Sequence, residues 1–291
     1  MISGHKKQAQ RLHSLFQSGN IPHALLFSGP ESVGKRTVAL WFLKMVNCFH
    51  EHGPCDVCEN CRGIEKEVHP DILKVTPEKK EIQLHQIEEI TERVYFKGLK
   101  ARFKGVLIDD AHLMNLQAQN SLLKILEEPP GDTVMVLVTE HPRILLPTVA
   151  SRSFEFKFSF VPEKEIKDFV RDEEAASLSL GRPGVAMSCC YFPEERERLK
   201  KEKEEAEAMA GGSVPSRFSI AKKVVKEERV EGFLGALLKV MEKKMKEGLQ
   251  KSEDTKDRRE VIKEIERTIF LHKKTNINKQ LALERIATKI K

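Results

Sequence analysis

Residues 29–37 read GPESVGKRT, and this stretch lies between a short apolar run and a helical pattern. Gly29, Gly34 and Lys35 fit the G-x-x-x-x-G-K pattern of a phosphate-binding loop. In such a loop the glycines let backbone N–H groups converge on phosphate oxygens, and the lysine reaches the terminal phosphates. The flanking strand and helix favour this interpretation over a chance match.

The residue after the lysine departs from the pattern. A Ser or Thr normally gives a hydroxyl oxygen to Mg²⁺ there, but position 36 is arginine. Its guanidinium is a permanent cation that repels a metal ion, and Thr37 lies roughly 100° farther around the helix. We expect ATP or ADP binding to remain possible, Mg²⁺ binding to be poor and hydrolysis to be impaired. The expected nucleotide-binding residues of the loop are Gly29, Pro30, Ser32, Val33, Gly34, Lys35, Arg36 and Thr37.

Outward from the loop, short apolar runs alternate with helical patterns over the first 160 residues. This alternation predicts an α/β domain with a parallel, RecA-like sheet covered by helices. The expected strands are residues 23–29, 71–77, 104–111, 133–140 and 153–159. Several of them are continuously apolar, as strands buried on both faces must be.

From Pro162 onward the sequence has only helical patterns. Residues 194–208 are nearly all charged, with both signs interleaved, which indicates a solvated helix or connector, and GGSVPS at 211–216 interrupts the chain. Cys189 and Cys190 lie in an apolar helical stretch and are expected in a core. The predicted domains are an α/β domain at 1–160, a small helical domain at 161–210 and a helical bundle at 211–291.

Two acids end the third predicted strand. Asp109 and Asp110 follow the apolar run VLI, where a Walker B motif would hold Mg²⁺ and orient the attacking water. A solvated turn is the alternative, but the strand and the loop belong to one alternating domain. At position 110 an ATPase of this kind carries glutamate, so aspartate is one methylene short.

Four of the six cysteines crowd into residues 48–61. Cys48, Cys55, Cys58 and Cys61 give C-x6-C-x2-C-x2-C, and four thiolates at this spacing predict a structural Zn²⁺ site. An iron–sulfur cluster fits less well, because the ferredoxin pattern needs a further C-P. His50 or His52 could replace Cys48 as a ligand. The segment is more acidic than basic, so it lacks the charge expected of a nucleic-acid contact.

The composition describes a charged, folded protein. With 291 residues, 40% of them hydrophobic, the chain can build two or three domains. Its 50 basic and 44 acidic residues leave a net charge of +6, which permits a phosphate-bearing partner but is also typical of a solvated surface. No apolar run approaches the roughly 20 residues that cross a bilayer, and no signal-peptide core is present. We expect a cytoplasmic protein without a membrane partner.

Several stretches together resemble the bacterial clamp-loader subunits of the AAA+ class. They are IPHALLFSGPESVGKRT (21–37), the cysteine insert, NLQAQNSLLKILEEPP (115–130), TVASRSFEFKF (148–158) and NINKQLALERIATKI (276–290). The resemblance covers essentially the whole chain. It implies an AAA+ domain with a zinc-binding insert, followed by a small helical lid domain and an α-helical collar domain.

The resemblance also implies residue roles. Ser151, Arg152 and Ser153 are similar to the family's SRC motif, whose arginine is a finger presented to ATP on a neighbouring subunit. Thr139 is similar to the sensor 1 position, which contacts the terminal phosphate. From the residues alone, a local ion pair and a strand-end hydroxyl are the alternatives. Gly184 stands where ATPase members have the sensor 2 arginine, and Arg182 precedes a proline, which disfavours helical geometry.

The resulting expectation is a non-catalytic AAA+ subunit of a DNA polymerase III clamp loader. Its implied partners are the tau/gamma-like ATPase and delta-like subunits, with the sliding clamp and primer-template DNA met through the complex during replication. The apolar stripes of the last domain would lie partly against other subunits. Two alternatives remain: an active clamp-loader ATPase in which Thr37 or water helps bind Mg²⁺, and a zinc-dependent DNA-binding protein.

Overall fold

The computed structural model describes residues 4–50, 53–96, 98–250, 255–274 and 277–290. Its elements fall into two compact units, which are described separately. The first unit holds the described residues up to Phe169 together with Gly181–Gly184. Its elements are α1 (Lys6–Gln17), β1 (Ala24–Ser28), α2 (Lys35–Asn47), α3 (Glu59–Glu65), β2 (Ile72–Val75), α4 (Leu84–Tyr95), β3 (Lys104–Ile108), η1 (Ala111–Leu113), α5 (Leu116–Glu127), β4 (Thr133–Thr139), η2 (Pro142–Ile144), α6 (Pro147–Ser151), β5 (Phe154–Lys157) and α7 (Glu163–Val170).

The five strands form one parallel sheet in the order β2-β3-β4-β1-β5. All five lie where the apolar runs predict them. Strand β1 is central, with Ser28 opposite Thr139 on β4 and opposite Lys157 on β5. The carboxyl ends of β1, β3 and β4 therefore meet at one edge of the sheet, which is where ligands bind in open α/β folds.

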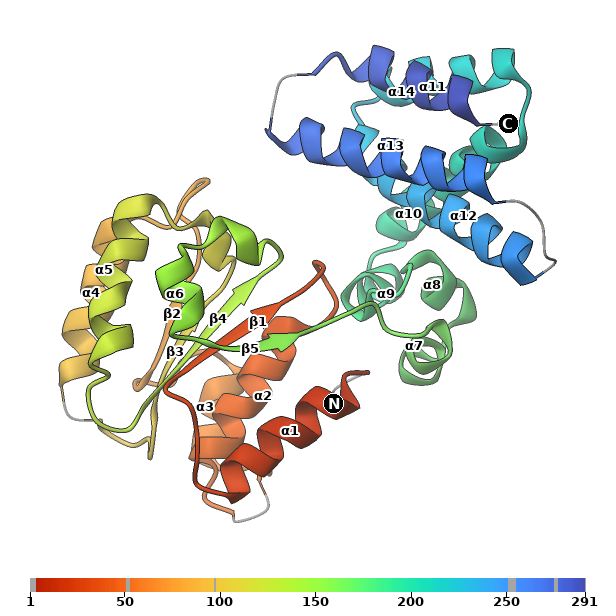
Figure 1. The fold of residues 1–291 in the computed structure, drawn as a ribbon. Helices are drawn as coiled ribbons and strands as arrows, with labels where there is room; N and C mark the ends of the chain where they lie inside the picture. The colour runs from red at the N-terminus through yellow and green to blue at the C-terminus, as the bar shows by residue number, and fades with distance from the viewer. Residues whose placement is uncertain (1–3, 51–52, 97, 251–254, 275–276, 291) are drawn as a thin grey trace. The chain divides into compact units, whose positions relative to one another are not determined.

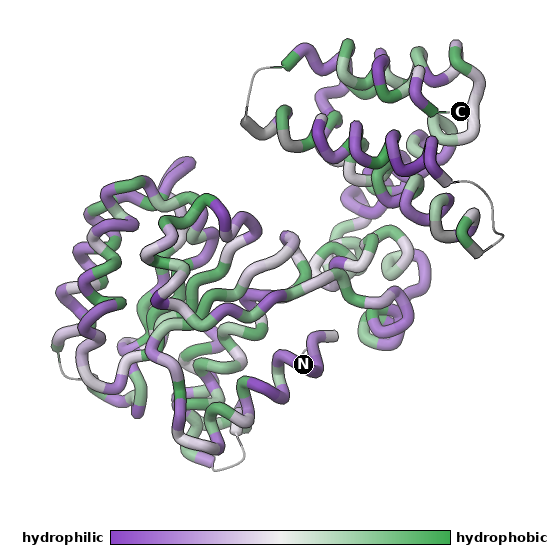
Figure 2. Tube along the Cα trace, in the orientation of Figure 1, coloured by the Kyte–Doolittle hydropathy of each residue, from purple (hydrophilic) through white to green (hydrophobic). Residues whose placement is uncertain are grey.

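Helices cover both faces of this sheet (Figure 1). Alternate strand residues such as Leu26 and Leu137 pack with α4 and α5, whereas Leu25 and Phe27 pack with α1 and α2. Strands β1 and β4 are correspondingly buried along their whole length, and hydrophobic residues run through the sheet (Figure 2). Full burial of each such side chain contributes about 1.5–3 kcal/mol, so the sheet core holds the loops at its edge in fixed positions.

The cysteine insert joins α2 to β2 and is anchored by buried polar groups. The Asn60 amide donates to the backbone carbonyl of Asn47 at 2.8 Å, and Asn47 accepts the Phe103 N–H at 2.8 Å. Lys44 reaches Asp56 and Glu65, both at 2.6 Å. Since Asn47 and Lys44 lie on α2, the insert is tied to the helix that begins at the phosphate-binding loop.

The second unit is helical throughout its described part. It holds Val170–Leu180 and the described residues from Val185 onward. Its elements are α8 (Glu173–Leu178), most of α9 (Pro183–Tyr191), α10 (Pro193–Gly211), α11 (Val214–Lys226), α12 (Val230–Gln250), α13 (Lys256–Lys274) and α14 (Lys279–Lys289). Its main core gathers apolar residues of α10–α14, among them Phe233, Leu237 and Ile286. The predicted apolar stripes of α12 and α14 thus pack largely within the chain.

Two details of this unit differ from the sequence-based expectation. Residues 194–208 form a helix as predicted, but Glu202 on it is only 1% exposed, because α12 packs against α10 there. A Cβ atom on Gly232 of α12 would lie 2.6 Å from a Glu202 carboxylate oxygen, so a larger residue there would require that carboxylate to shift. Cys189 is buried as expected, whereas Cys190 is exposed, so its assignment to a core was wrong.

The described residues form two compact units. The division of the chain into three domains remains a prediction. Among the described helices, none combines the length and the apolar character that a membrane crossing requires.

Candidate nucleotide site and candidate metal centre

The phosphate-binding loop joins β1 to α2, and its glycines are required by geometry. Gly29 has φ 143° and Gly34 has φ 103°, values that side chains rarely permit. A Cβ on Gly29 would also lie 2.3 Å from the backbone oxygen of Phe158. Helix α2 begins directly after Gly34, so its N-terminal N–H groups face the loop and favour an anion there.

The loop is held from two other segments. The His5 ring lies 2.9 Å from the carbonyl oxygen of Val33 and packs edge-on against Phe158, and its burial lowers the pKa of His5. The N–H of Gly184, at the start of α9, donates to the Ser32 carbonyl at 2.9 Å. A Cβ on Gly184 would lie 3.0 Å from that oxygen, so the residue in the sensor 2 position serves here as a close backbone contact.

Arg182 lies outside α9, as its place before a proline predicts. Its guanidinium stacks over Phe160, 5.7 Å from the ring centroid. In the structure, Arg182 therefore packs locally against Phe160.

Lys35 is buried and bonded to its own loop. Its ammonium donates to the carbonyl oxygens of Gly29 at 2.8 Å and Pro30 at 2.6 Å. Burial lowers the pKa of Lys35, and the nearby carboxylates of Glu140 and Asp110 oppose that effect. These two hydrogen bonds hold the lysine within reach of the loop interior, where terminal phosphates would lie.

Arg36 contacts the first of the two strand-end acids. Its guanidinium forms an ion pair with Glu67, and its Nε lies 3.6 Å from a carboxylate oxygen of Asp109. Lys74 and Arg36 together hold the pKa of Glu67 below its usual value. A cation supplied by the chain thus stands beside the acid that a magnesium ion would need, while Thr37 is exposed to solvent on α2.

The other predicted residues of this edge lie close by. Asp110 adopts a left-handed conformation with φ 50°, and desolvation together with Asp109 and Glu140 raises its pKa. Thr139 is fully buried, its carbonyl accepts the Gly29 N–H at 3.2 Å, and its hydroxyl oxygen accepts the His141 N–H at 3.0 Å. The sheet therefore brings the loop, both acids and Thr139 together at one edge.

Arg152 lies elsewhere, between α6 and β5. Its Nη2 atom is 2.8 Å from Glu127 on α5, and its Nη1 donates to the Thr148 carbonyl at 3.2 Å. The side chain is 38% exposed. In the isolated chain Arg152 therefore has the local ion pair that was the alternative to a finger, at a position still open to a neighbour.

The four cysteines of the insert converge on one point. The sulfur atoms of Cys48, Cys55, Cys58 and Cys61 lie within 4.8 Å of one another. Four zinc–sulfur bonds of about 2.3 Å place tetrahedral thiolates about 3.8 Å apart, so the donor set fits Zn²⁺ after a small contraction. Backbone N–H donors lower the pKa of Cys55 to about 6, and burial raises that of Cys61 to about 12.

Cys48 completes this cluster, so a histidine ligand is not needed. The backbone N–H of His50 instead lies 3.4 Å from the Cys48 sulfur, as a donor to it. His52 lies outside the described residues. The N–H groups of Cys58 and Cys61 donate to the sulfurs of Cys55 and Cys58, at 3.3 and 3.4 Å. Such N–H donors stabilise thiolates, which are the form that binds metal.

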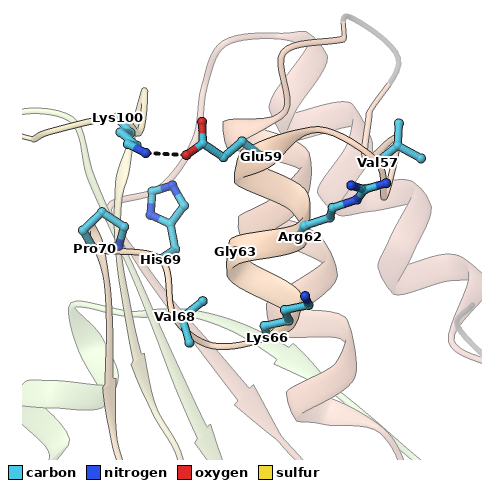
Figure 3. A pocket seen from close by; sticks show the side chains of 9 residues that line it. All are labelled: Val57, Glu59, Arg62, Gly63, Lys66, Val68, His69, Pro70 and Lys100. Carbon is cyan, nitrogen blue, oxygen red and sulfur yellow. Dashed lines mark hydrogen bonds and ion pairs between the residues drawn. The ribbon is translucent and has the colours of Figure 1, made fainter.

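An open cavity of about 440 Å³ lies beside α3, between the insert and the start of β2 (Figure 3). Arg62 on α3 and Lys66 directly after α3 line it, and an ion pair between Glu59 and Lys100 spans one side. It is separate from the residues of the phosphate-binding loop.

Sequence reasoning missed the groups that support the site from a distance. His5 and Glu67 are 28 and 31 residues from their loop partners Val33 and Arg36. No motif in the neighbouring sequence marks either residue as a partner of the loop. Glu67 has a left-handed backbone conformation, with φ 56°.

A parallel sheet of this strand order, with a phosphate-binding loop after β1, an acid pair after β3 and a helical region after β5, defines an AAA+ P-loop protein. Residues 4–162 match the family described as DNA polymerase III, delta subunit, and the chain belongs to that family.

Individual relatives agree with this assignment. The chain is 36% identical to DNA polymerase III subunit delta' of Bacillus subtilis over 166 residues, which cover 57% of this chain and 50% of that protein. It is 34% identical to DNA polymerase III subunit gamma of Buchnera aphidicola over 191 residues, covering 61% and 52%. The chain thus spans about half the length of these curated relatives.

One solved structure supports the fold. A gamma subunit-related protein of DNA polymerase III from Thermotoga maritima superposes with a TM-score of 0.52 at 20% identity. The match covers 95% of this chain and 97% of that one. At this identity the likeness concerns the fold alone.

Proposed function

We propose that this chain is a delta prime-like stator subunit of the DNA polymerase III clamp loader. In this role it helps to load the sliding clamp onto primed DNA without hydrolysing ATP itself. Family membership and relatives named delta', gamma and tau support a place in that complex. The contact of Arg36 with Asp109 supports the loss of hydrolysis.

The argument from Arg36 is electrostatic. In an active P-loop ATPase, a hydroxyl and an acid hold Mg²⁺ between them, and the ion neutralises charge on the phosphates. Here the arginine occupies the hydroxyl's position in the sequence and is paired with the acid in the structure. A metal ion would have to displace this guanidinium from both Asp109 and Glu67. Aspartate at position 110 and glycine at position 184 stand where ATPase members carry a glutamate and the sensor 2 arginine, so two further groups used in hydrolysis are missing.

The remaining groups suit a subunit that assists its neighbours. Arg152 is partly exposed, and as a planar, permanently charged group it can stabilise phosphoryl transfer on an adjacent tau/gamma-like ATPase. The four-cysteine insert would hold Zn²⁺ and stiffen the segment that carries Glu67 toward Arg36. The helical unit would contact the ATPase and delta-like subunits, whereas clamp and DNA are reached through the complex.

Reconstitution tests this function. The purified chain is mixed with the tau/gamma-like and delta-like subunits of the same organism, and assembly is followed by native mass measurement. The expected result is a stable complex whose phosphate release is unchanged by Lys35→Ala in this chain, while the isolated chain releases none.

Two results would contradict the proposal. Absence of any association removes this chain from the clamp loader. Magnesium-dependent phosphate release by the isolated chain, lost in Lys35→Ala, would instead identify an active ATPase that uses the intact loop.

A further inference from the structure

A second group of potential metal ligands lies at the sheet edge, apart from the cysteines. His112 belongs to η1 directly after β3, and Glu140 and His141 follow β4. The Glu140 Oε1 atom lies 3.0 Å from His141 Nε2 and 3.9 Å from His112 Nε2. The potential donor atoms of all three lie within 4.8 Å of one another. Since β3 and β4 are parallel neighbours, their pairing creates this group from residues 28 and 29 positions apart.

The two histidines have defined contacts with each other and with the end of β4. His112 is 9% exposed at its side chain, and its ring packs edge-on against His141 at 5.2 Å. The backbone of His141 is fixed by its hydrogen bond to the buried Thr139 hydroxyl. The ends of β3 and β4 thus bring two imidazoles and one carboxylate together.

The electrostatic setting favours a cation at this point. Asp109 and Asp110 end the neighbouring strand, and the charge of Glu140 acts on Asp110 and on Lys35. The hydrogen bonds of Lys35 run to the loop carbonyls of Gly29 and Pro30, and Arg36 is engaged by Glu67 and Asp109. The two cations of the loop are therefore directed at other acceptors.

We propose that His112, Glu140 and His141 form a second metal site, which binds a divalent transition-metal ion of the Zn²⁺ class. Two imidazole nitrogens and a carboxylate oxygen suit Zn²⁺, Co²⁺ or Ni²⁺, with water completing the coordination. Mg²⁺ and Ca²⁺ prefer oxygen ligands and are not expected here.

The distances from the two histidines to Glu140 require only a small adjustment. Bonds of about 2.0–2.1 Å to a tetrahedral ion place neighbouring donor atoms about 3.3 Å apart. The pair of Glu140 and His141 already meets this spacing, and His112 must move toward Glu140 by roughly half an ångström. Because Glu140 directly follows Thr139, the ion would lie next to the nucleotide cradle.

The chain offers a matched control. His85 and Glu78 form another surface pair, with Nε2 and the carboxylate oxygen 3.5 Å apart. In the described residues this pair belongs neither to the four-cysteine cluster nor to the group of His112, Glu140 and His141. It has the same two residue types, and both side chains are more than half exposed. A change at this pair therefore shows the effect on metal binding of losing a histidine–glutamate pair that lies outside the proposed site.

Cobalt titration of the untagged full chain tests the proposal. Bound Co²⁺ is counted by equilibrium dialysis, and its absorption separates thiolate-coordinated ion from ion bound by nitrogen and oxygen. The expected result is two ions per chain, the second without a thiolate band. His141→Ala and Glu140→Gln should each weaken binding of the second ion by about tenfold or more. His85→Ala should leave the affinity for both ions unchanged.

His112→Asn serves as an additional variant, with its folding checked by circular dichroism because the side chain is nearly buried. The proposal is overturned if wild type binds only the thiolate-coordinated ion. It is equally overturned if His141→Ala and Glu140→Gln bind the second ion as tightly as wild type, since that ion then lies elsewhere.

Discussion

The Nε atom of Arg36 lies 3.6 Å from the carboxylate of Asp109, at the edge of the sheet where a P-loop ATPase holds its magnesium ion. Glu67 binds the same guanidinium from the insert side. The chain thereby replaces a diffusible cation by a covalently attached one.

Replacing Arg36 by serine should make nucleotide binding depend on Mg²⁺. The change restores a hydroxyl ligand and releases Asp109 from its ion pair. For wild type we expect ADP affinity to be nearly the same with Mg²⁺ or with chelator. For the variant we expect Mg²⁺ to tighten ADP binding about tenfold, which corresponds to about 1.4 kcal/mol. Fluorescent ADP titrations measure both values.

Arg62→Ser is the control for this experiment, because Arg62 lies on α3 beside the separate cavity. It should bind nucleotide as wild type does. If ADP binding to wild type already requires Mg²⁺, Arg36 does not act as an internal cation.

Arg152→Ala should leave this chain folded and able to assemble, but slow hydrolysis at the ATP site that it faces. An arginine finger contributes about 10³-fold or more in related systems, so a loss of that order is expected at this one site. Single-turnover measurements on the reconstituted complex resolve it from the other sites. Unchanged rates at every site would remove Arg152 from catalysis.

Glu127→Gln separates the finger from its resting contact. Glu127 holds Arg152 at 2.8 Å in the isolated chain, so neutralising it should free the arginine without removing it. We expect hydrolysis by the complex to be retained or increased in this variant. A loss as large as that of Arg152→Ala would mean that the ion pair itself matters.

Cys58→Ser should lower the zinc content by about one ion per chain and loosen the insert, since a structural site needs all four ligands. Proteolysis should then begin near α3, while the sheet stays protected. Cys190→Ser, at an exposed thiol far from the cluster in sequence, should keep its zinc. Normal zinc content in Cys58→Ser would exclude the four-thiolate site.

Glu202 should make the helical unit less stable as pH rises. Burial raises the pKa of Glu202 above its ordinary value, despite Arg198 and Arg229 nearby. The folded unit therefore binds the proton more tightly than the unfolded chain does. The free energy of unfolding should fall as pH rises from about 4.3 to the raised pKa, and stay level above it.

Glu202→Gln should lose this part of the pH dependence, because its amide carries no charge. Thermal unfolding of both proteins between acid and neutral pH measures the difference. Identical pH profiles would show that the carboxyl of Glu202 titrates normally when folded.

Local patterns predicted most of the framework. Apolar runs located all five strands, and cysteine spacing located the four thiols that the fold brings together. The pairing of Arg36 with Glu67 was not predictable, because the partners are 31 residues apart and meet only through the insert. The same reason hid the group of His112, Glu140 and His141, which depends on β3 lying beside β4. Cys190 was misassigned because hydropathy does not say which side of a helix faces outward.

The hydrogen bond from the Gly184 N–H to the Ser32 carbonyl has a mechanical consequence. Gly184 is the last residue of its segment that belongs to the sheet-containing unit, and Val185 already belongs to the helical one. Any ligand that reshapes the backbone at Ser32 must strain or break a bond at the very residue where the chain crosses between units. A ligand in the cradle would therefore act on the start of α9 through one peptide group, without a side chain as messenger.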